Sequence, residues 1–580
     1  MTDHASPLTA GWRHRAAVAL LIALAAWAFF FRLGAAPLLD DPNDGEYAEV
    51  AREMVEMGEW LSPHLNYVLF LNKPPLAYWG IALADQLFGV NELAARLPSA
   101  VVGLVIVLLL ARLGTVLFDA QTGVLAGFLL LSSAGFLLET HLVRPDLLLT
   151  AAILGALLCF TRLIQADAAA RHWSAASAWH PGWPLLGLQV ALAVGVLAKG
   201  FLALVIPGLV IVVLAVTERQ PRILARLLHP RSWWLFALLV VPWHALMAVR
   251  HPGFLWDYVV QQHVLFFFDR KFPRDSEPVS LGTFWAAFAF RLSPWAIFAP
   301  LAAVAAVVRL RREPNYGDRL ALAWVAVVLG FFSAAASRME HYSLPALPAC
   351  ALLGARLFRD YARTSKQPLS QAVKWHAVAL GALATLGPFV VPRVVSGDAW
   401  LAPVHEMAAL ATRTCALFAA GTALAGLAAL TQRRALVAPL IIATIVLEVP
   451  FLNQGLQLVA RVNSSAAMAA VIRRVADAAD TSVFEAPVEY QNCAGLNFYL
   501  RRKLALVQPR EFVPPAYLGP HMNELFISRD RLDELWRDQR VFLVTDPLTF
   551  RVQLDGTVPH PFYVVARDYA RWAITNYPLH

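Results

Sequence analysis

Long apolar runs recur along this chain, and they restrict its possible folds more than any other feature of the sequence. Each run approaches the roughly 20 residues that an α-helix needs to cross the hydrocarbon core of a bilayer. The composition agrees, because 58% of the residues are hydrophobic and only 15% are charged, whereas soluble proteins carry about 25% charged residues. We therefore predict an α-helical polytopic membrane protein with about 13 transmembrane helices. The expected spans are 16–31, 95–112, 120–138, 147–165, 184–198, 200–216, 232–249, 286–308, 319–336, 343–358, 374–392, 411–430 and 434–452.

The placement of arginine predicts how the chain is oriented. The first apolar run follows a basic stretch at 12–15 and lacks a small-residue cleavage site, so we expect an uncleaved first span. With a cytoplasmic N-terminus, every predicted inner loop is basic, as the positive-inside rule requires. An odd number of spans then places the C-terminal segment outside, which in the inner membrane of a bacterium means the periplasm. Basic inner loops also explain the net charge of +8 without a nucleic-acid partner.

The C-terminal segment, 454–580, has the composition of a soluble domain. Strand-like runs at 541–544 and 562–565 follow a helical pattern at 529–539, which indicates a small α/β domain. We therefore expect a transmembrane domain over 1–453, with outer loops at 33–93 and 249–285, and a periplasmic domain over 454–580. The four cysteines are far apart in sequence, which argues against a zinc cluster or a disulfide framework.

Five polar clusters fall on the predicted outer face, at 39–49, 72–79, 141–146, 257–275 and 337–348. Asp40, Asp41 and Asp44 in the first cluster exceed what a helix N-cap needs, although capping explains one or two of them. Lys73 precedes two prolines at a helix entrance, where it is either a phosphate contact or a lysine that reaches the membrane surface. Asp146 opens an apolar span, a costly position unless it faces water or a partner.

The last two clusters combine charge with aromatic residues. The basic residues of 257–275, among them Arg270 and Lys271, suit an anionic partner such as a lipid headgroup or a diphosphate, and a self-paired charged surface is the alternative. In the cluster 337–348, Glu340, His341 and Tyr342 precede two prolines, which are able to kink a membrane helix around a cavity. No H-E-x-x-H or C-x-x-C motif supports a zinc site.

In this order, the clusters resemble motifs of the GT-C glycosyltransferases of the protein O-mannosyltransferase superfamily. The bacterial branch that modifies lipid A with aminoarabinose is the most similar. Its D-E-x-x-Y-A-E-x-x-R-E-M motif corresponds to N-D-G-E-Y-A-E-V-A-R-E-M at 43–54, and its G-D-W-x-x-P-H-x-N motif to 58–66. Its E/N-K-P-P-x-x-Y-W motif matches 72–79, its lysine-glycine element matches 199–200, and its S-K-x-x-x-Y-x-L-P-x-x-P motif matches 337–348. The resemblance spans about the first 360 residues.

The resemblance implies a GT-C fold, a sugar donor linked to undecaprenyl phosphate and a periplasmic acceptor such as lipid A or another glycoconjugate. The position usually occupied by the catalytic aspartate is Asn43 here, and an amide is no general base. Asp44, Asp41 and Asp146 are therefore the alternatives for that role. Some family members are metal-independent, and the glutamate implicated in metal binding in others is Asn72 here, so we expect no required cofactor and only weak support for a divalent metal.

The expected reaction is an inverting displacement in which the phosphate leaves and the acceptor attacks. Charge stabilisation of that phosphate is assigned to Lys73, Arg270, Lys271 and Tyr342. Asp44 and Asp146 are the candidates that would activate the acceptor, with Asp41 in reserve. Asn43 stays among the catalytic candidates because it occupies the family's catalytic position. The remaining candidates for substrate binding are Tyr47, His64, Arg144, His263, Glu340 and His341.

Other classes of function stay open. A lipid-linked sugar transporter or flippase would need polar groups near the midplane of the membrane and repeat symmetry, and the sequence offers neither. A non-catalytic scaffold is the reading that Asn43 favours. Protein O-glycosylation is the alternative within the enzyme class. We expect a monomer in contact with membrane lipids.

Overall fold

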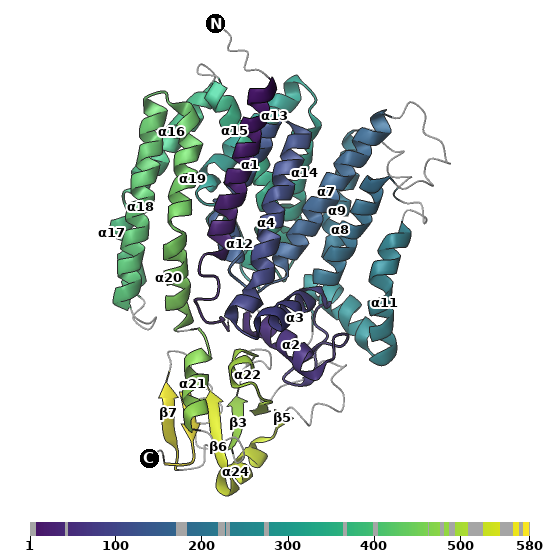
Figure 1. Ribbon diagram of the computed structural model, residues 1–580, viewed down its shortest axis with the longest axis vertical. Helices are drawn as coiled ribbons and strands as arrows, with labels where there is room; N and C mark the ends of the chain where they lie inside the picture. Colours follow the sequence, from purple (N-terminus) through teal and green to yellow (C-terminus); the bar gives the residue numbers. More distant parts are fainter. Residues whose placement is uncertain are drawn as a thin grey trace.

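The computed structural model consists of a tall bundle of helices standing on a small sheet domain, with the two chain termini at opposite ends (Figure 1). The structure describes residues 7–40, 44–169, 182–218, 227, 233–271, 278–363, 368–397, 404–461, 463–475, 481–486, 494–507, 526–545, 561–567 and 572–578. The main hydrophobic core lies inside the bundle, where Trp324 and many leucines are fully buried.

Within these described ranges, seven helices are long and apolar enough to cross a membrane, or eight if one bent pair forms a single span. Four shorter apolar helices, α5, α8, α9 and α11, accompany them. A multi-pass membrane protein is therefore confirmed, and the number of 13 spans stays a prediction. The bundle helices are α1 (Pro7–Phe30), α4 (Glu92–Leu117), α5 (Ala120–Leu131), α6 (Ala134–Glu139), α7 (Asp146–Ala169), α8 (Trp183–Lys199), α9 (Leu202–Thr217), α11 (Trp234–Arg250), α12 (Leu281–Leu292), α13 (Ala299–Arg312), α14 (Tyr316–Ala334), α15 (Leu347–Arg363), α16 (Pro368–Ala384), α17 (Gly387–Gly397), α18 (Val404–Leu430), α19 (Val437–Leu447) and α20 (Val449–Ala460).

Several expected spans are interrupted, two of them in ways that shape the bundle. The run 286–308 is not one straight helix, because α12 ends before Pro294 and a 3₁₀ turn, η4 (Trp295–Phe298), leads into α13 at an angle of 104°. Proline lacks the N–H that a continuing helix needs. The run 120–138 is likewise divided between α5 and α6, where the hydroxyls of Ser132 and Ser133 bond back to carbonyls of the preceding turn.

The predicted outer loop 33–93 folds into a compact unit at the sheet-domain end of the bundle (Figure 1). It contains α2 (Asp44–Met57), a short hairpin of β1 (His64–Leu65) and β2 (Val68–Leu69), and α3 (Leu76–Phe88). Arg52 of α2 is buried and pairs with Glu49, with its Nε 2.7 Å from Oε2. The later acidic residues of this motif therefore stabilise α2 itself.

The C-terminal segment forms the small α/β domain that the sequence predicts. Its six strands are ordered β5-β4-β3-β6-β8-β7, with β3 to β6 parallel and β7 and β8 antiparallel. The predicted strands and helix correspond to β6, β7 and α24. The elements are α21 (Ala466–Val475), β3 (Thr481–Ala486), α22 (Ala494–Leu500), β4 (Ala505–Val507), β5 (Phe526–Ile527), α24 (Arg529–Asp538), β6 (Arg540–Thr545), β7 (Tyr563–Arg567) and β8 (Trp572–Thr575).

This domain packs directly against α2. A Cβ on Gly45 would lie 2.7 Å from the backbone of Gly495, so these two backbone segments meet without side chains between them. Asn497 Nδ2 donates to Asn66 Oδ1 at 2.6 Å, and Asn66 Nδ2 donates to the carbonyl of Leu504 at 2.7 Å. Contacts with the C-terminal domain therefore fix the position of the beginning of α2. The boundary at 453/454 stays a prediction.

Candidate active site

Asp146, the first residue of α7, lies at the centre of a buried polar cluster. Lys199, at the end of α8, donates to Asp146 Oδ1, and His341 Nε2 lies 3.9 Å from the same oxygen. The ammonium of Lys199 also lies 5.1 Å from the centre of the Tyr342 ring. Three segments far apart in sequence thus meet at one carboxylate.

Asp44 is the first residue of α2, and its side chain is completely buried. The backbone N–H of Val143 donates to Oδ1 at 2.9 Å, and Arg96 Nη2 lies 3.5 Å from Oδ2. Burial raises the pKa of Asp44 above its ordinary value, although Arg96, the Val143 N–H and Arg144 act in the opposite direction. A carboxylate with a raised pKa is a stronger base, which suits proton abstraction.

Arg144 connects these two carboxylates. Its guanidinium is buried, and its charge interacts with Glu139, Asp146, Asp44 and Glu340, which together raise its pKa against the effect of burial. Its Nη1 lies 3.6 Å from Glu139 Oε1. Asp44, Arg144, Asp146 and Glu340, all of them candidates from the sequence, therefore lie in one electrostatic cluster.

Tyr47 of α2 joins the same cluster. It is buried and stacks on Tyr78 with ring centres 5.3 Å apart. Burial raises its pKa, and the nearby charges of Glu46 and Asp146 add to the effect. Tyr47 therefore stays protonated at neutral pH, as a hydrogen-bond donor.

A second cluster lies directly beyond Lys199. Gly200 has a φ of +86°, and a Cβ there would lie 2.3 Å from His263 Nε2, so the turn after α8 requires glycine. His263 belongs to a π-helix, η3 (Trp256–Leu265); its Nδ1 donates to the Tyr258 carbonyl at 2.6 Å, and its Nε2 accepts from Phe201 N at 3.2 Å. Burial, together with a smaller effect of the charge of Lys73, lowers its pKa to about 4. Lys73 therefore lies near this cluster.

Other predicted residues are placed differently or remain undescribed. His64 lies in β1 opposite Leu69. Arg270 is exposed in the turn after η3, and Lys271 follows it partly buried; their contact with a phosphate stays a prediction. Asp41 and Asn43 lie outside the described residues.

The sequence did not single out Lys199, Glu139, Arg96 or Arg291 as site residues. Arg291 Nη1 donates to Glu139 Oε1 at 2.5 Å, and both side chains are buried. The available signal was a charged residue at the end of an apolar run, which is costly without a partner. The partners themselves come from distant segments and could not be read from spacing.

The donor set does not favour a metal. Within the ranges that the structure describes, no group of three or more His, Cys, Asp or Glu side chains is arranged to hold an ion. Asn72 Oδ1, at the family's glutamate position, accepts from Gln262 Nε2 at 2.7 Å. We therefore derive no step that requires a metal.

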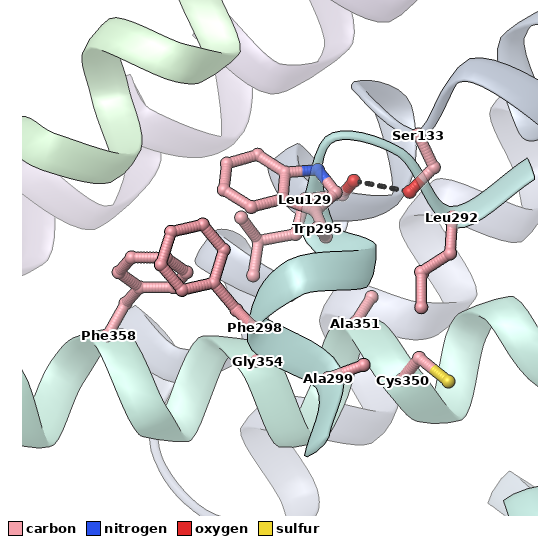
Figure 2. Close-up of a pocket in the computed structure, with 10 residues that line it drawn as sticks. All are labelled: Leu129, Ser133, Leu292, Trp295, Phe298, Ala299, Cys350, Ala351, Gly354 and Phe358. Atoms are coloured by element: carbon pink, nitrogen blue, oxygen red, sulfur yellow. Dashed lines mark hydrogen bonds between the residues drawn. The ribbon is translucent and has the colours of Figure 1, made fainter. Parts of the chain in front are cut away.

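One described cavity lies at the bend between α12 and α13, where residues of α15 and of the end of α5 also line it (Figure 2). Its lining is almost entirely apolar and includes Leu292, Trp295 and Phe358. The volume open to the centre of a water-sized sphere is about 10 Å³, about enough for a single water molecule. This cavity is too small and too apolar for a sugar.

The helical bundle with its small C-terminal α/β domain is the architecture of a GT-C membrane fold. The sequence profile of the dolichyl-phosphate-mannose-protein mannosyltransferase family matches residues 72–245. A crystal structure of ArnT from Cupriavidus metallidurans bound to undecaprenyl phosphate has a TM-score of 0.80 with this chain, covering 98% of both chains at 23% identity. The apo structure of the same protein gives the same score at 24% identity. The predicted GT-C fold and the resemblance are confirmed.

Curated relatives carry a more specific name, undecaprenyl phosphate-α-4-amino-4-deoxy-L-arabinose arabinosyl transferase. Arabinosyl transferase 2 of Proteus mirabilis (strain HI4320), which carries that name, is 29% identical over 365 residues, 62% of each chain. The one numbered 1 in Sodalis glossinidius (strain morsitans) is 31% identical over 332 residues, 56% of each chain. The match thus spans less than two thirds of these relatives.

Proposed function

We propose that this protein is a membrane glycosyltransferase that transfers a sugar from undecaprenyl phosphate to a periplasmic acceptor. The observation that carries the proposal is the buried cluster in which Asp44, Arg144 and Asp146 meet Lys199 and His341 at one end of the bundle. The names of the relatives and the undecaprenyl phosphate bound to ArnT support this donor. Lipid A or another envelope glycoconjugate is the proposed acceptor.

In the proposed mechanism, cations stabilise the departing phosphate. Lys73 lies at the entrance of α3, beside the second cluster, and its partners in this role are Arg270, Lys271 and Tyr342. A phosphate monoester is a weakly basic leaving group and needs no general acid. Preorganised charge in a site shielded from water supplies the larger part of the stabilisation.

Asp44 is the proposed base. Its raised pKa follows from burial, and its position beside Arg144 keeps it within the cluster. Asp146 is already engaged by Lys199 and His341, so its proposed role is to hold both of them in place. Attack by the deprotonated acceptor on the face opposite the phosphate inverts the anomeric centre.

The transporter alternative receives no support from the position of the charges. The buried ionic residues Asp44, Arg144 and Asp146 lie at helix beginnings and in the loops beside them, and not in the middle of spans. A transport site would lie near the midplane of the membrane.

The test uses the purified full chain in vesicles with a synthetic undecaprenyl phosphate sugar and envelope lipids as acceptors. Mass spectrometry measures the glycosylated acceptor and the released undecaprenyl phosphate. We expect both products from the wild type, and we expect the rate of transfer to fall by about 10²–10⁴-fold in the Asp44→Asn variant. Movement of intact donor across the vesicle membrane without product would favour the transporter instead.

A further inference from the structure

Glu139, at the end of α6, is a buried acid between two arginines. Its Oε1 accepts from Arg291 Nη1 at 2.5 Å and lies 3.6 Å from Arg144 Nη1. Arg291 belongs to α12, 152 positions away. Neither Glu139 nor Arg291 has a part in the proposed reaction as described so far.

Arg291 is itself held tightly by α6. A Cβ on Gly135 would lie 2.4 Å from Arg291 Cγ and 2.6 Å from its Cα, so glycine is what allows the two helices to approach this closely. Ala134 N also donates to the Ser293 carbonyl at 2.9 Å. The backbone of α12, just before its bend, therefore fixes where the guanidinium of Arg291 lies.

Arg144 needs such support, because its charge interacts with four nearby acids. Asp44, Asp146 and Glu340 attract its charge, and Glu139 does so most strongly. A long, flexible side chain in this field has several ion pairs available to it. The pair with Glu139, anchored by Arg291, selects one arrangement.

We propose that Glu139 and Arg291 are positioning residues that hold Arg144 between Asp44 and Asp146. The proposal rests on the proposed function, in which Asp44 and Asp146 serve the transfer reaction. Arg291 fixes Glu139, Glu139 fixes Arg144, and Arg144 fixes the relative placement of the two carboxylates. A misplacement of about 1 Å in such a site costs about 100-fold in rate.

The experiment compares Glu139→Gln, Arg291→Met and Arg291→Lys with the wild type, all as full-length protein. Asp318→Asn is the matched control, since Asp318 is also fully buried between two arginines, Arg309 and Arg356, away from this cluster. Turnover is measured in the transfer assay, and affinity is measured by direct binding of undecaprenyl phosphate. We expect Glu139→Gln and Arg291→Met to lower turnover about 10- to 100-fold with little change in affinity. Arg291→Lys keeps the charge and should recover part of the loss.

The double variant Glu139→Gln/Arg291→Met separates positioning from simple helix packing. If the pair only joins α6 to α12, removing both charges leaves neither partner buried without the other, Arg144 keeps its other carboxylates, and turnover returns to the wild-type level. If the pair positions Arg144, the double variant stays slow. Recovery in the double variant, or an equal loss of turnover in Asp318→Asn, would overturn the proposal.

A second readout does not depend on transfer. Phenylglyoxal modifies accessible arginines, and peptide mass spectrometry measures the reaction at Arg144. Release of Arg144 should make it react several-fold faster in Glu139→Gln than in the wild type, with no change in Asp318→Asn. An unchanged rate at Arg144 would refute the positioning role even if transfer is observed. A faster rate without any transfer by the wild type would instead refute the proposed function alone.

Discussion

Asp318 and Glu139 are two buried acids that each lie between two arginines, but their carboxylate oxygens differ in how many hydrogen bonds they accept. Asp318, at the beginning of α14, receives two bonds of 2.9 Å from Arg309 and one of 2.7 Å from Arg356. Both of its oxygens are therefore occupied. Glu139 also lies between two arginines, yet among the described residues its Oε2 has no hydrogen-bond partner.

The difference extends to the neighbours. His141 Nε2, two positions along the chain from Glu139, and His341 Nδ1, whose ring lies beside Asp146, are likewise buried without a hydrogen-bond partner in the described part of the structure. A buried polar atom left unpaired costs about 1–3 kcal/mol. The completed cluster around Asp318 therefore suits stability, and the incomplete one suits a ligand that supplies the missing bonds.

The largest effect is expected for Asp146→Asn, which should abolish transfer. The variant leaves the ammonium of Lys199 buried beside an amide, and breaking a buried pair in this way costs about 3–5 kcal/mol. Loss of folding would then imitate loss of function. Asp146→Asn/Lys199→Met removes both charges and should regain thermal stability without regaining transfer. Turnover at the wild-type rate in either variant would remove Asp146 from the reaction.

Asp318→Asn tests the other side of the comparison. Two arginines then lose their shared carboxylate, so the free energy of unfolding should fall by about 3 kcal/mol. Transfer measured well below the melting temperature should stay within twofold of the wild type, about the scatter expected for a site without coupling to the reaction. A large loss of turnover in folded protein would mean that the two clusters are coupled and that the distinction drawn between them is wrong.

Lys73→Ala should weaken undecaprenyl phosphate binding by about 10- to 100-fold, which is the value of a charge-assisted hydrogen bond. Lys374→Ala is a suitable control, because Lys374 contacts the Trp375 ring on α16 at 5.2 Å. Both affinities are measured by direct binding in the same detergent. Equal affinity for Lys73→Ala and the control would assign Lys73 to the membrane surface instead.

Apolar length and helix-start motifs predict elements and candidate residues, but they carry little information on which distant residues contact one another. A multi-pass membrane protein and the small α/β domain follow from apolar length and strand patterns and are confirmed. The number of spans and the roles of Asp44, Arg144 and Asp146 stay predictions. The bend at Pro294 was missed because the flanking residues are apolar enough to continue the span. Arg291 was missed, and Lys199 was recognised only as part of a lysine-glycine motif and not as a site residue. Their importance lies in pairing with Glu139 and Asp146, and sequence spacing does not report such long-range pairs.

The pH dependence of transfer gives the smallest and most specific effect. The proposed base, Asp44, must be deprotonated, and burial raises its pKa above the ordinary value of 3.8. Activity should therefore fall as the pH drops through that raised pKa, at a higher pH than for an ordinary aspartate. Asn43→Asp adds a second negative charge in the neighbouring position, which disfavours ionisation of Asp44 and should move this loss of activity to still higher pH. Steady-state rates between pH 4 and 8, about the range in which a raised carboxylate titrates, measure the shift; an unchanged profile in Asn43→Asp would mean that Asp44 is not the group being titrated.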